Sequence, residues 1–524
     1  MPPTAGTRLE RLREAVELLE SIAADRSVLE GVPDEERKRL LQAVASVYHP
    51  DRVERRRMSK ITARERKAAR VERDQATRSE TGIQTLRRKP VFHTPNVFPP
   101  EAFEPDDVRD EPPHLAPSHH ALSHHAPSHV APSSRRTSRE LQHCYVCKQK
   151  YSVIHHFYDQ LCPECAALNF AKRTELADLR GRVALLTGGR VKIGYQAGLK
   201  LLRCGAHLIV TTRFPRDSAT RYAQEPDFAE WGNRLEIFGL DLRHTPSVEA
   251  FCRHLLATRS RLDFIINNAC QTVRRPPDFY AHMMEGETAA VTDMAEHARK
   301  LVGSYEGLRG YHLLPEAKGE APGLMRAAEL SQVRLLPEEL AAQKDLFPEG
   351  RLDQDLQQID LRERNSWRLL LAEVPSVELL EVHLVNAIAP FIINARLKPL
   401  MLRTPERDKH VVNVSAVEGQ FYRKFKTTRH PHTNMAKAAL NMMTRTAATD
   451  YHGDGIHMNS VDTGWVTDED PAETAARKTV EQRFHPPLDI VDGAARIADP
   501  IISGINSGKH VWGQFLKDYR PADW

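Results

Sequence analysis

The 524-residue sequence is poor in cysteine and aromatic residues and has no long uninterrupted apolar run. Seven cysteines are too few to cross-link a secreted chain of this length, so we expect a reducing, cytoplasmic environment. The longest nearly apolar stretch, residues 377–402, contains Glu378, Glu381, Arg396 and Lys398, whose charges a bilayer core would strongly disfavour. We therefore expect a buried helix there and no membrane partner. The N-terminal residues also lack the apolar core of a signal peptide.

Positive charge is concentrated in one segment. The net charge is +4, but residues 51–89 hold 14 Lys and Arg against 6 Asp and Glu, which is +8 and leaves −4 for the rest of the chain. This segment favours helix but has almost no apolar stripe, so it is either a solvated helix or a surface for an acidic partner. Nucleic-acid binding is a third possibility, although interleaved aromatic residues and a groove-reading element are lacking.

Residues 1–96 are predicted to form a helical N-terminal region. Apolar side chains recur at helical spacing in residues 9–22 and 40–48, which predicts two amphipathic helices. The second ends at His49-Pro50-Asp51, a tripeptide that resembles the signature loop of J-domain co-chaperones. The apolar third helix of such a domain does not follow, so we interpret the tripeptide as a chance match. Residues 97–138 are rich in Pro, His and Ser, which predicts a flexible linker.

A small metal-binding module is predicted over residues 139–178. Cys144 and Cys147 form one CxxC pair, and Cys162 and Cys165 form a second pair 14 residues later. Four thiolates on two tight turns are the ligand set that tetrahedral zinc takes in closed structural sites. A pair of redox dithiols is the alternative, but it would need a thioredoxin-like context that the sequence does not show. His155 and His156 are alternate ligands only if a cysteine is not used.

Residues 179–524 are predicted to form an α/β domain with a doubly wound parallel sheet. Short apolar runs stand at 183–186, 208–210, 235–238, 264–266 and 411–414, with helical patterns between them. This alternation stops over residues 274–375, which we interpret as a helical insertion. After the first run, a glycine turn over 187–194 leads into an amphipathic helix, where a dinucleotide pyrophosphate would meet the helix N-terminus.

From residue 179 onward the chain resembles the short-chain dehydrogenase/reductase family. Residues 187–194 match its TGxxxGxG turn, with Lys192 in place of the middle glycine, and residues 267–270 match its NNAG strand end, with Cys270 in place of the glycine. The other matches are Asp241 after the third strand, Asn386 in the fourth helix, Lys437, and the sixth-strand segment 456–467. The resemblance covers 179–274 and 377–467 and implies a Rossmann-type fold that binds a nicotinamide dinucleotide.

The resemblance and the local charge together assign the candidate site residues. The candidate cofactor-binding residues are Thr187, Gly188, Arg190, Ile193, Gly194, Arg213, Asp241, Asn268, Ala269, Lys437, Gly464 and Thr467. The candidate catalytic positions are Lys437, Asn386, Thr433 and Ser415. The second strand ends in Thr211-Thr212-Arg213 without the carboxylate that NAD-binding forms use, so NADP is preferred and NAD stays possible. Lys192 either pairs with a phosphate or blocks its approach.

The usual proton-handling residues of the family are displaced. The family has a tyrosine four residues before the lysine, where this chain has Thr433, and the family's serine position falls on Ala416, one place after Ser415. Threonine has too high a side-chain pKa to act alone near neutrality. His432, Tyr422 or Tyr280 would have to compensate, although His432 is expected to be a solvent-exposed loop residue.

These observations predict an NADP-dependent oxidoreductase that transfers hydride between the nicotinamide and a carbonyl or alcohol substrate. The alternative is a catalytically degenerate nucleotide-binding scaffold or sensor that uses its zinc and basic modules to bind partners. Family resemblance also implies a homodimer or tetramer built through the helices that contain Asn386 and Lys437.

Overall fold

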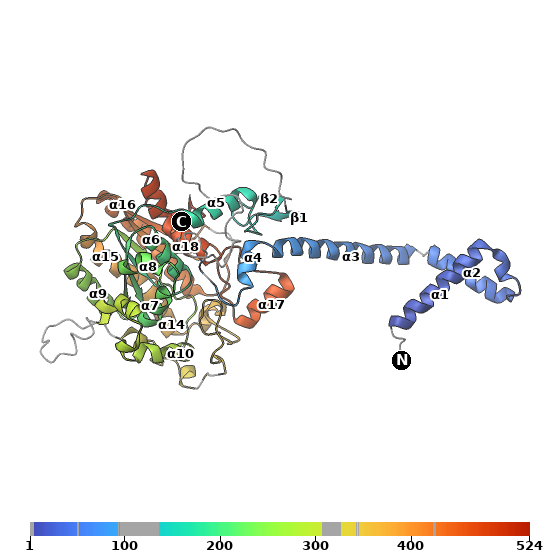
Figure 1. Cartoon of the computed structure of the whole chain (residues 1–524), viewed down its shortest axis with the longest axis horizontal. Coiled ribbons are helices and arrows are strands. Elements are labelled where there is room, and N and C mark those ends of the chain that lie inside the picture. Colours follow the sequence, from blue (N-terminus) through green and yellow to red (C-terminus); the bar gives the residue numbers. More distant parts are fainter. Residues whose placement is uncertain are drawn as a thin grey trace. The chain divides into compact units, whose positions relative to one another are not determined.

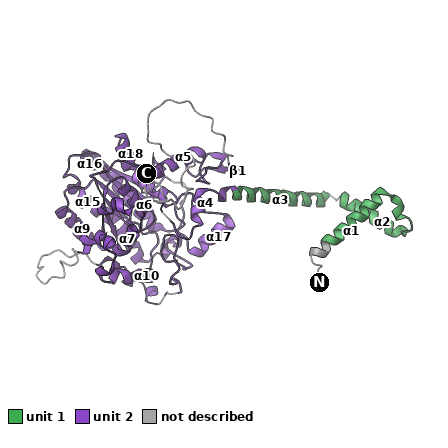
Figure 2. Cartoon of the chain, viewed as in Figure 1, with its two compact units in different colours: residues 1–76 green, residues 77–524 purple. Residues whose placement is uncertain are grey.

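The computed structural model describes residues 5–49, 52–92, 94, 136–306, 326–341, 343, 345–422 and 426–524. Within it the chain forms two compact units, residues 1–76 and residues 77–524, coloured separately in Figure 2. Most of the predicted linker, Pro50 and Asp51 of the tripeptide, and residues 307–325 of the insertion lie outside the described residues.

The first unit is helical, as predicted. It consists of α1 (Ala5–Ala24), the short 3-10 helix Arg26–Leu29, α2 (Asp34–Tyr48) and most of α3 (Arg52–Ser79). Helix α2 begins with three acidic residues, whose charges favour a helix N-terminus. Apolar side chains of both predicted amphipathic helices, including Leu12 and Leu41, remain exposed. Helix α3 carries most of the basic segment on its surface.

The second unit is built on an eight-stranded sheet in the order β10-β9-β8-β7-β6-β3-β4-β5. The strands are β3 (Val183–Thr187), β4 (His207–Thr212), β5 (Leu235–Gly239), β6 (Phe264–Asn267), β7 (Lys409–Ser415), β8 (Ile456–Asp462), β9 (Phe515–Lys517) and β10 (Arg520–Ala522). All neighbours pair in parallel except β9 and β10. This confirms the predicted doubly wound sheet, whose strand order reverses between β3 and β6, the place where such sheets bind ligands.

Helices cover both faces of this sheet (Figure 1). One core joins the sheet to α6 (Lys192–Arg203), α7 (Pro215–Ala223) and α18 (Ile490–Ser507). The other core joins it to α9 (Thr245–Thr258), α15 (Ala389–Met401) and α16 (Pro431–Gly453). Helices α8 (Phe228–Trp231) and α17 (Ala472–Gln482) complete the unit's Rossmann part.

The apolar stretch near residue 377 is only partly buried. Helix α14 (Ser376–His383), a π-helical turn (Leu384–Ile388) and α15 form one run, Ser376–Met401, that is long and apolar enough to cross a bilayer by length and composition alone. It packs on α9 and α16 as a layer of the α/β fold. The expectation of a buried helix was too strong, because Leu380, Ile388 and Phe391 are exposed.

The insertion covers one end of the sheet. Its described helices are α10 (Pro277–Thr288), α11 (Glu296–Leu301), α13 (Ala327–Leu330) and 3-10 turns at Val291–Asp293, Pro337–Leu340, Ser366–Arg368 and Leu371–Glu373. Phe279, Tyr280 and Phe347 of the insertion form a small apolar cluster with Phe214, which follows β4. This cluster brings α10 over the carboxyl end of β4.

The cysteine module packs directly on the α/β domain. It consists of the antiparallel strands β1 (Thr137–His143) and β2 (Lys150–Val153) and the helix α5 (Pro163–Thr174). Helix α4 (Gly82–Arg87) packs into the core of this module. This core is shared with Val466, Leu488 and Ile490 of the α/β domain. The module therefore packs against that domain and belongs to the same compact unit.

Candidate active site

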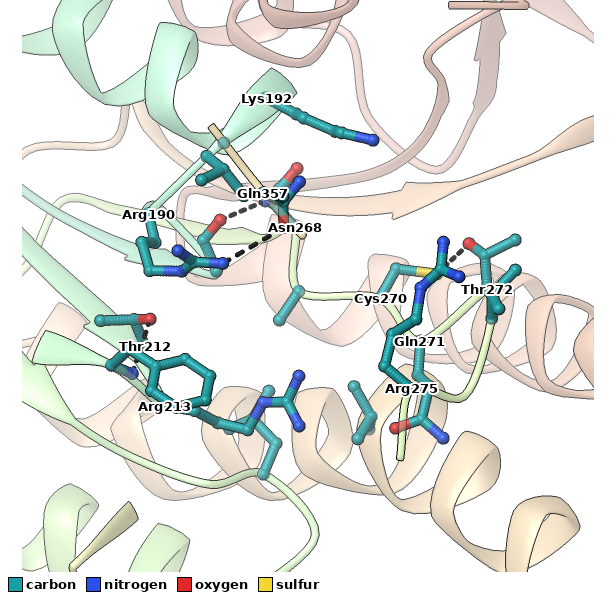
Figure 3. A pocket seen from close by; sticks show the side chains of 18 of the residues that line it. Arg190, Lys192, Thr212, Arg213, Asn268, Cys270, Gln271, Thr272, Arg275 and Gln357 are labelled. Carbon is teal, nitrogen blue, oxygen red and sulfur yellow. Dashed lines mark hydrogen bonds between the residues drawn. The ribbon is translucent and has the colours of Figure 1, made fainter. Parts of the chain in front are cut away.

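A cavity of about 370 Å³ lies at the carboxyl ends of β4, β5 and β6, beside the glycine turn. Figure 3 shows Arg190, Lys192, Arg213 and Arg275 around it, reaching it from different segments of the chain. The insertion supplies part of the wall, including Tyr280 and Gln357. The cavity is thus basic, and it stands at the strand-order reversal.

The glycine turn has the close packing that a dinucleotide site needs. Gly188 has φ of +70°, and a Cβ at Gly194 would overlap the Gly188 carbonyl oxygen and the Asn268 side chain. Asn268 Nδ2 donates to the carbonyl oxygens of Thr187 and Gly188, each at 3.1 Å. The end of β6 therefore fixes the turn, and the helix N-terminus at Ile193 stays open to the cavity.

Lys192 lies in the left-handed backbone region that favours glycine, with φ of +54°. Its Nζ lies 4.0 Å from Asp355 Oδ2 of the insertion. The sequence left open whether Lys192 pairs with a phosphate or blocks its approach. In the structure its ammonium group lies near a carboxylate of the insertion. The backbone of the turn is left accessible.

The two arginines proposed for the cofactor differ in their surroundings. Arg190 is buried, and its Nη1 lies 2.7 Å from Asp217 Oδ2. Arg213 donates from Nη2 to the Tyr280 hydroxyl at 2.6 Å and stacks on that ring. No ion pair joins Arg213 to a carboxylate of the described residues. Arg213 therefore offers charge to a ligand, whereas Arg190 already has a partner.

Asp241 lies at the cavity wall in a tight ion pair. Arg243 binds it through Nη2 at 2.6 Å and also reaches Glu381 at 2.9 Å. Burial opposes ionisation, but the hydrogen bonds and charge of Arg243 hold the pKa of Asp241 below its usual value. An adenine amine at this position would meet an ionised, oriented carboxylate.

A second cavity of about 1020 Å³ adjoins the first and holds the candidate catalytic residues. Lys437 Nζ donates to the Val414 carbonyl oxygen at 2.8 Å. The Ser415 hydroxyl donates to Asn441 Oδ1 at 2.6 Å, and the buried Thr433 hydroxyl has no hydrogen-bond partner among the described residues. The structure brings Ser415, Thr433 and Lys437 to one cavity without joining them in a chain of hydrogen bonds.

Asn386 binds the backbone of Gln271, which lines the first cavity. Its Oδ1 accepts from the Gln271 N–H at 2.8 Å, and its Nδ2 donates to the Gln271 carbonyl oxygen at 3.2 Å. Both functional ends of this amide are engaged. Asn386, predicted as a catalytic position, thus holds the Gln271 backbone and lies in the lining of neither cavity.

Of the compensating residues, one expectation was wrong. His432 is buried within α16, with Nε2 3.3 Å from Glu378 Oε1, because the helix begins at Pro431 and turns this ring inward. Tyr422 is exposed and lines the second cavity. Tyr280 lines the first cavity, beside Arg213, and not the cavity of Lys437.

Sequence reasoning missed Asp462, which lines the second cavity at the end of β8. It lies beside Ser415 in the parallel register, and its Oδ1 accepts from the Val417 N–H at 3.2 Å. Burial raises its pKa to about 6, against the opposing charge of Lys517. The available signal was a carboxylate at the carboxyl end of a strand in the segment that resembles the family's sixth strand.

The four cysteines of the module form one cluster. Their sulfur atoms all lie within 4.8 Å of one another, and the Cys147 and Cys162 sulfurs are 3.6 Å apart. A tetrahedral zinc with bonds of about 2.3 Å separates its sulfurs by about 3.8 Å, so the donor set fits this metal. His155 lies outside the cluster, and its Nδ1 accepts from the Phe157 N–H at 3.1 Å.

Two family models match the α/β domain in chain order. A model described as short chain dehydrogenase matches residues 182–294, and one described as enoyl-(acyl carrier protein) reductase matches residues 366–488. The region between them lies within the insertion.

Individual proteins are similar over very different lengths. Uncharacterized protein R665 of Acanthamoeba polyphaga mimivirus is 29% identical over 386 residues, which is 71% of this chain and 74% of that protein. Dehydrogenase/reductase SDR family member 13 of Bos taurus is 35% identical over 105 residues, or 19% of this chain and 28% of the relative. The chain thus matches only about a quarter of that relative's length.

Among solved structures, the Pseudomonas aeruginosa RhlG/NADP active-site complex is 17% identical, with a TM-score of 0.39, covering 65% of this chain and 95% of that one. The two family models each extend into one end of the insertion, and together they contain the glycine turn, the end of β6 and Lys437. The chain therefore belongs to the short-chain dehydrogenase/reductase family of oxidoreductases.

Proposed function

We propose that the protein is an NADP(H)-dependent oxidoreductase acting on a carbonyl or alcohol substrate. The observation that carries the proposal is Arg213, which lines the first cavity at the end of β4 and forms no ion pair with a carboxylate of the described residues, although its charge helps to hold the pKa of the nearby Asp241 low. A ribose 2′-phosphate at this point would receive a charge-assisted hydrogen bond. An acidic residue, which would favour NAD, is lacking at the same strand end.

The residues present fit a dinucleotide. Gly188 and Gly194 keep side chains off the turn, the N-terminus of α6 faces the cavity, and Asp241 stands ready to accept from the adenine amine. The bound nicotinamide would donate or accept the hydride. Lys437 at the second cavity would hold the cofactor ribose and orient the proton donor.

The proton must come from a group other than a tyrosine at position 433. The Thr433 hydroxyl is a poor acid, and the Ser415 hydroxyl already donates to Asn441. We propose that the wide second cavity accepts the substrate and that its proton transfer differs from that of the family.

The coenzyme preference is tested by substituting Arg213. Arg213→Ala should weaken NADPH binding about tenfold or more and change NADH binding little, since a hydrogen bond to a charged group contributes about 1.5–3 kcal/mol. Arg213→Lys, which keeps the charge, is the matched control and should retain most of the preference. Titration by cofactor fluorescence measures both. Equal affinity of the wild type for NADPH and NADH would overturn the preference.

We also propose that the cysteine cluster binds one structural zinc ion. The support is the convergence of four sulfurs in a small module whose core is shared with the α/β domain. Purified protein should contain about one equivalent of zinc, and Cys162→Ser should lose at least half of it. Cys270→Ser, an exposed thiol outside the cluster, is the control and should retain the metal. Unchanged zinc content in Cys162→Ser would refute the assignment.

A nucleotide-binding scaffold is the second candidate. The observation that favours it is the separation of the hydroxyls: Thr433 and Ser415 share no hydrogen bond with each other or with Lys437. Single-turnover oxidation of NADPH with a panel of carbonyl compounds distinguishes the two. A protein that binds NADPH and reduces none of the panel supports the scaffold.

Two kinds of macromolecular partner and a cellular compartment are also proposed. Exposed Leu380, Phe391, Met435 and Met442 on α14, α15 and α16 favour pairing of two copies through these helices, which sedimentation would detect. The exposed basic face of α3 favours an acidic partner. Seven free thiols favour a reducing compartment such as the cytoplasm.

A further inference from the structure

The first cysteine knuckle forms part of the wall of the second cavity. Tyr145, between Cys144 and Cys147, lines that cavity, and so does Lys148. The Tyr145 hydroxyl accepts a hydrogen bond from the Trp465 N–H at 2.9 Å. The cysteine cluster therefore lies one residue away from a direct contact with the loop that follows β8.

That loop contains the residues expected to hold the nicotinamide end of the cofactor. It includes Gly464, with φ of +75°, and Thr467, which lines both cavities. A Cβ at Gly464 would lie 3.5 Å from the Tyr145 hydroxyl and would clash with Leu488. Because Tyr145 binds the backbone between Gly464 and Thr467, a shift of the knuckle would move this loop.

The second cysteine knuckle holds the other end of the same segment. Cys162 caps α5, whose Arg173 binds Asp489 at 2.7 Å and Asp492 at 3.1 Å. These two carboxylates form the capping box at the start of α18, and Tyr158 donates to Asp492. The segment from the β8 loop to the start of α18 is thus held at both ends by the module. Tyr145 of the first knuckle binds its beginning, and Arg173 of the helix that begins at the second knuckle binds its end.

A metal ion bound by all four cysteines would fix the positions of the two knuckles relative to each other. The knuckles belong to separate turns, and their backbones are joined by the Tyr145 N–H, which donates to the Gln160 carbonyl oxygen at 2.8 Å. The strands β1 and β2 that support them are short. Four bonds from one ion to both CxxC pairs would fix Tyr145 relative to Arg173 more firmly than this contact alone.

We propose that occupancy of the cysteine cluster sets the position of the loop 463–467 and thereby controls binding of the nicotinamide half of the cofactor, with Tyr145 as the positioning residue. The proposal rests on the proposed function, because it presupposes binding of NADP(H). The first cavity, where Arg213 and Asp241 would bind the adenosine half, has no lining residue from the module among the described residues. The coupling is therefore selective for one half of the cofactor.

The test compares NADPH with 2′,5′-ADP, which has the adenosine half alone, on the full-length protein. Tyr145→Phe removes one hydrogen bond and should weaken NADPH binding about fivefold while 2′,5′-ADP affinity and zinc content stay unchanged. Tyr151→Phe is the matched control, since the Tyr151 hydroxyl donates to the Asp159 carbonyl oxygen within the module, away from the loop. It should leave both affinities unchanged.

A metal arm completes the experiment. Chelation of zinc should lower NADPH affinity and spare that for 2′,5′-ADP, and added zinc should restore the first. The coupling is overturned if Tyr145→Phe binds NADPH as the wild type does, or if chelation lowers the two affinities equally. Wild-type protein that binds neither ligand would instead refute the proposed function itself.

Discussion

Replacement of Asp462 should change the pH dependence of stability in a defined direction. Burial raises the pKa of this carboxyl to about 6 from 3.8, so the folded protein binds the proton more tightly than the unfolded chain. Its contribution to stability is present in full below about pH 3.8 and is lost as the pH rises through about 6. The whole loss corresponds to about 3 kcal/mol, of which about 1.4 kcal/mol falls between pH 5 and pH 8.

Asp462→Asn removes this loss and keeps an oxygen that can accept from the Val417 N–H. We therefore expect the free energy of unfolding of the variant, relative to wild type, to rise by about 1.4 kcal/mol from pH 5 to pH 8. Any fixed cost of burying the new amide is present at both pH values and cancels in this difference.

Urea unfolding followed by tryptophan fluorescence measures the effect, because all five tryptophans lie in residues 77–524 and report on that unit alone. Asp293→Asn, at an exposed aspartate of the insertion, is the control and should show no such difference between the two pH values. An Asp462→Asn variant whose stability relative to wild type is the same at pH 5 and pH 8 would refute the reasoning.

Three further predictions follow from the site and the core. Gly194→Ala should weaken NADPH binding at least tenfold because the new Cβ overlaps the turn, whereas Gly303→Ala, where it meets nothing within 4 Å, should leave titrations unchanged. Thr433→Tyr combined with Ala416→Ser should raise the rate of carbonyl reduction, since both positions line an open cavity; an inert double variant that still binds NADPH would favour the scaffold. Burial holds the pKa of His410 well below its usual value, so lowering the pH from 7 to 5.5 should destabilise wild type by about 1 kcal/mol more than His410→Leu in urea unfolding, and equal losses would contradict this.

Periodic and local patterns predicted the fold, whereas contacts between distant segments decided the site. The apolar runs and the glycine turn indicated the parallel sheet because strand pattern and turn chemistry are local properties. The spacing of the cysteines likewise anticipated the convergence of their sulfurs. The partner of Arg213 could not be inferred, because Tyr280 lies in an insertion with no motif.

The errors have the same origin. His432 was expected to be a solvent-exposed loop residue, but it lies in the first turn of α16, where its ring is buried against Glu378. From the sequence, Tyr145 was only a residue between two predicted zinc ligands, Cys144 and Cys147, and no role could be predicted for it. Its contact with Trp465, 320 positions away, depends on how the module packs on the α/β domain.

The contact between Arg213 and Tyr280 connects the proposed site of coenzyme choice directly to the insertion. A guanidinium presents five N–H donors, and the phenol oxygen of Tyr280 takes one of them. A phosphate bound by the remaining donors would lie between the end of β4 and α10. Its hydrogen bonds would add to the one that already joins Arg213 to Tyr280. Helix α10 is also held to the start of α7 by Glu287, whose Oε1 accepts from the Arg216 and Asp217 N–H groups, so a coenzyme without that phosphate would leave α10 in place but would lack this bridge.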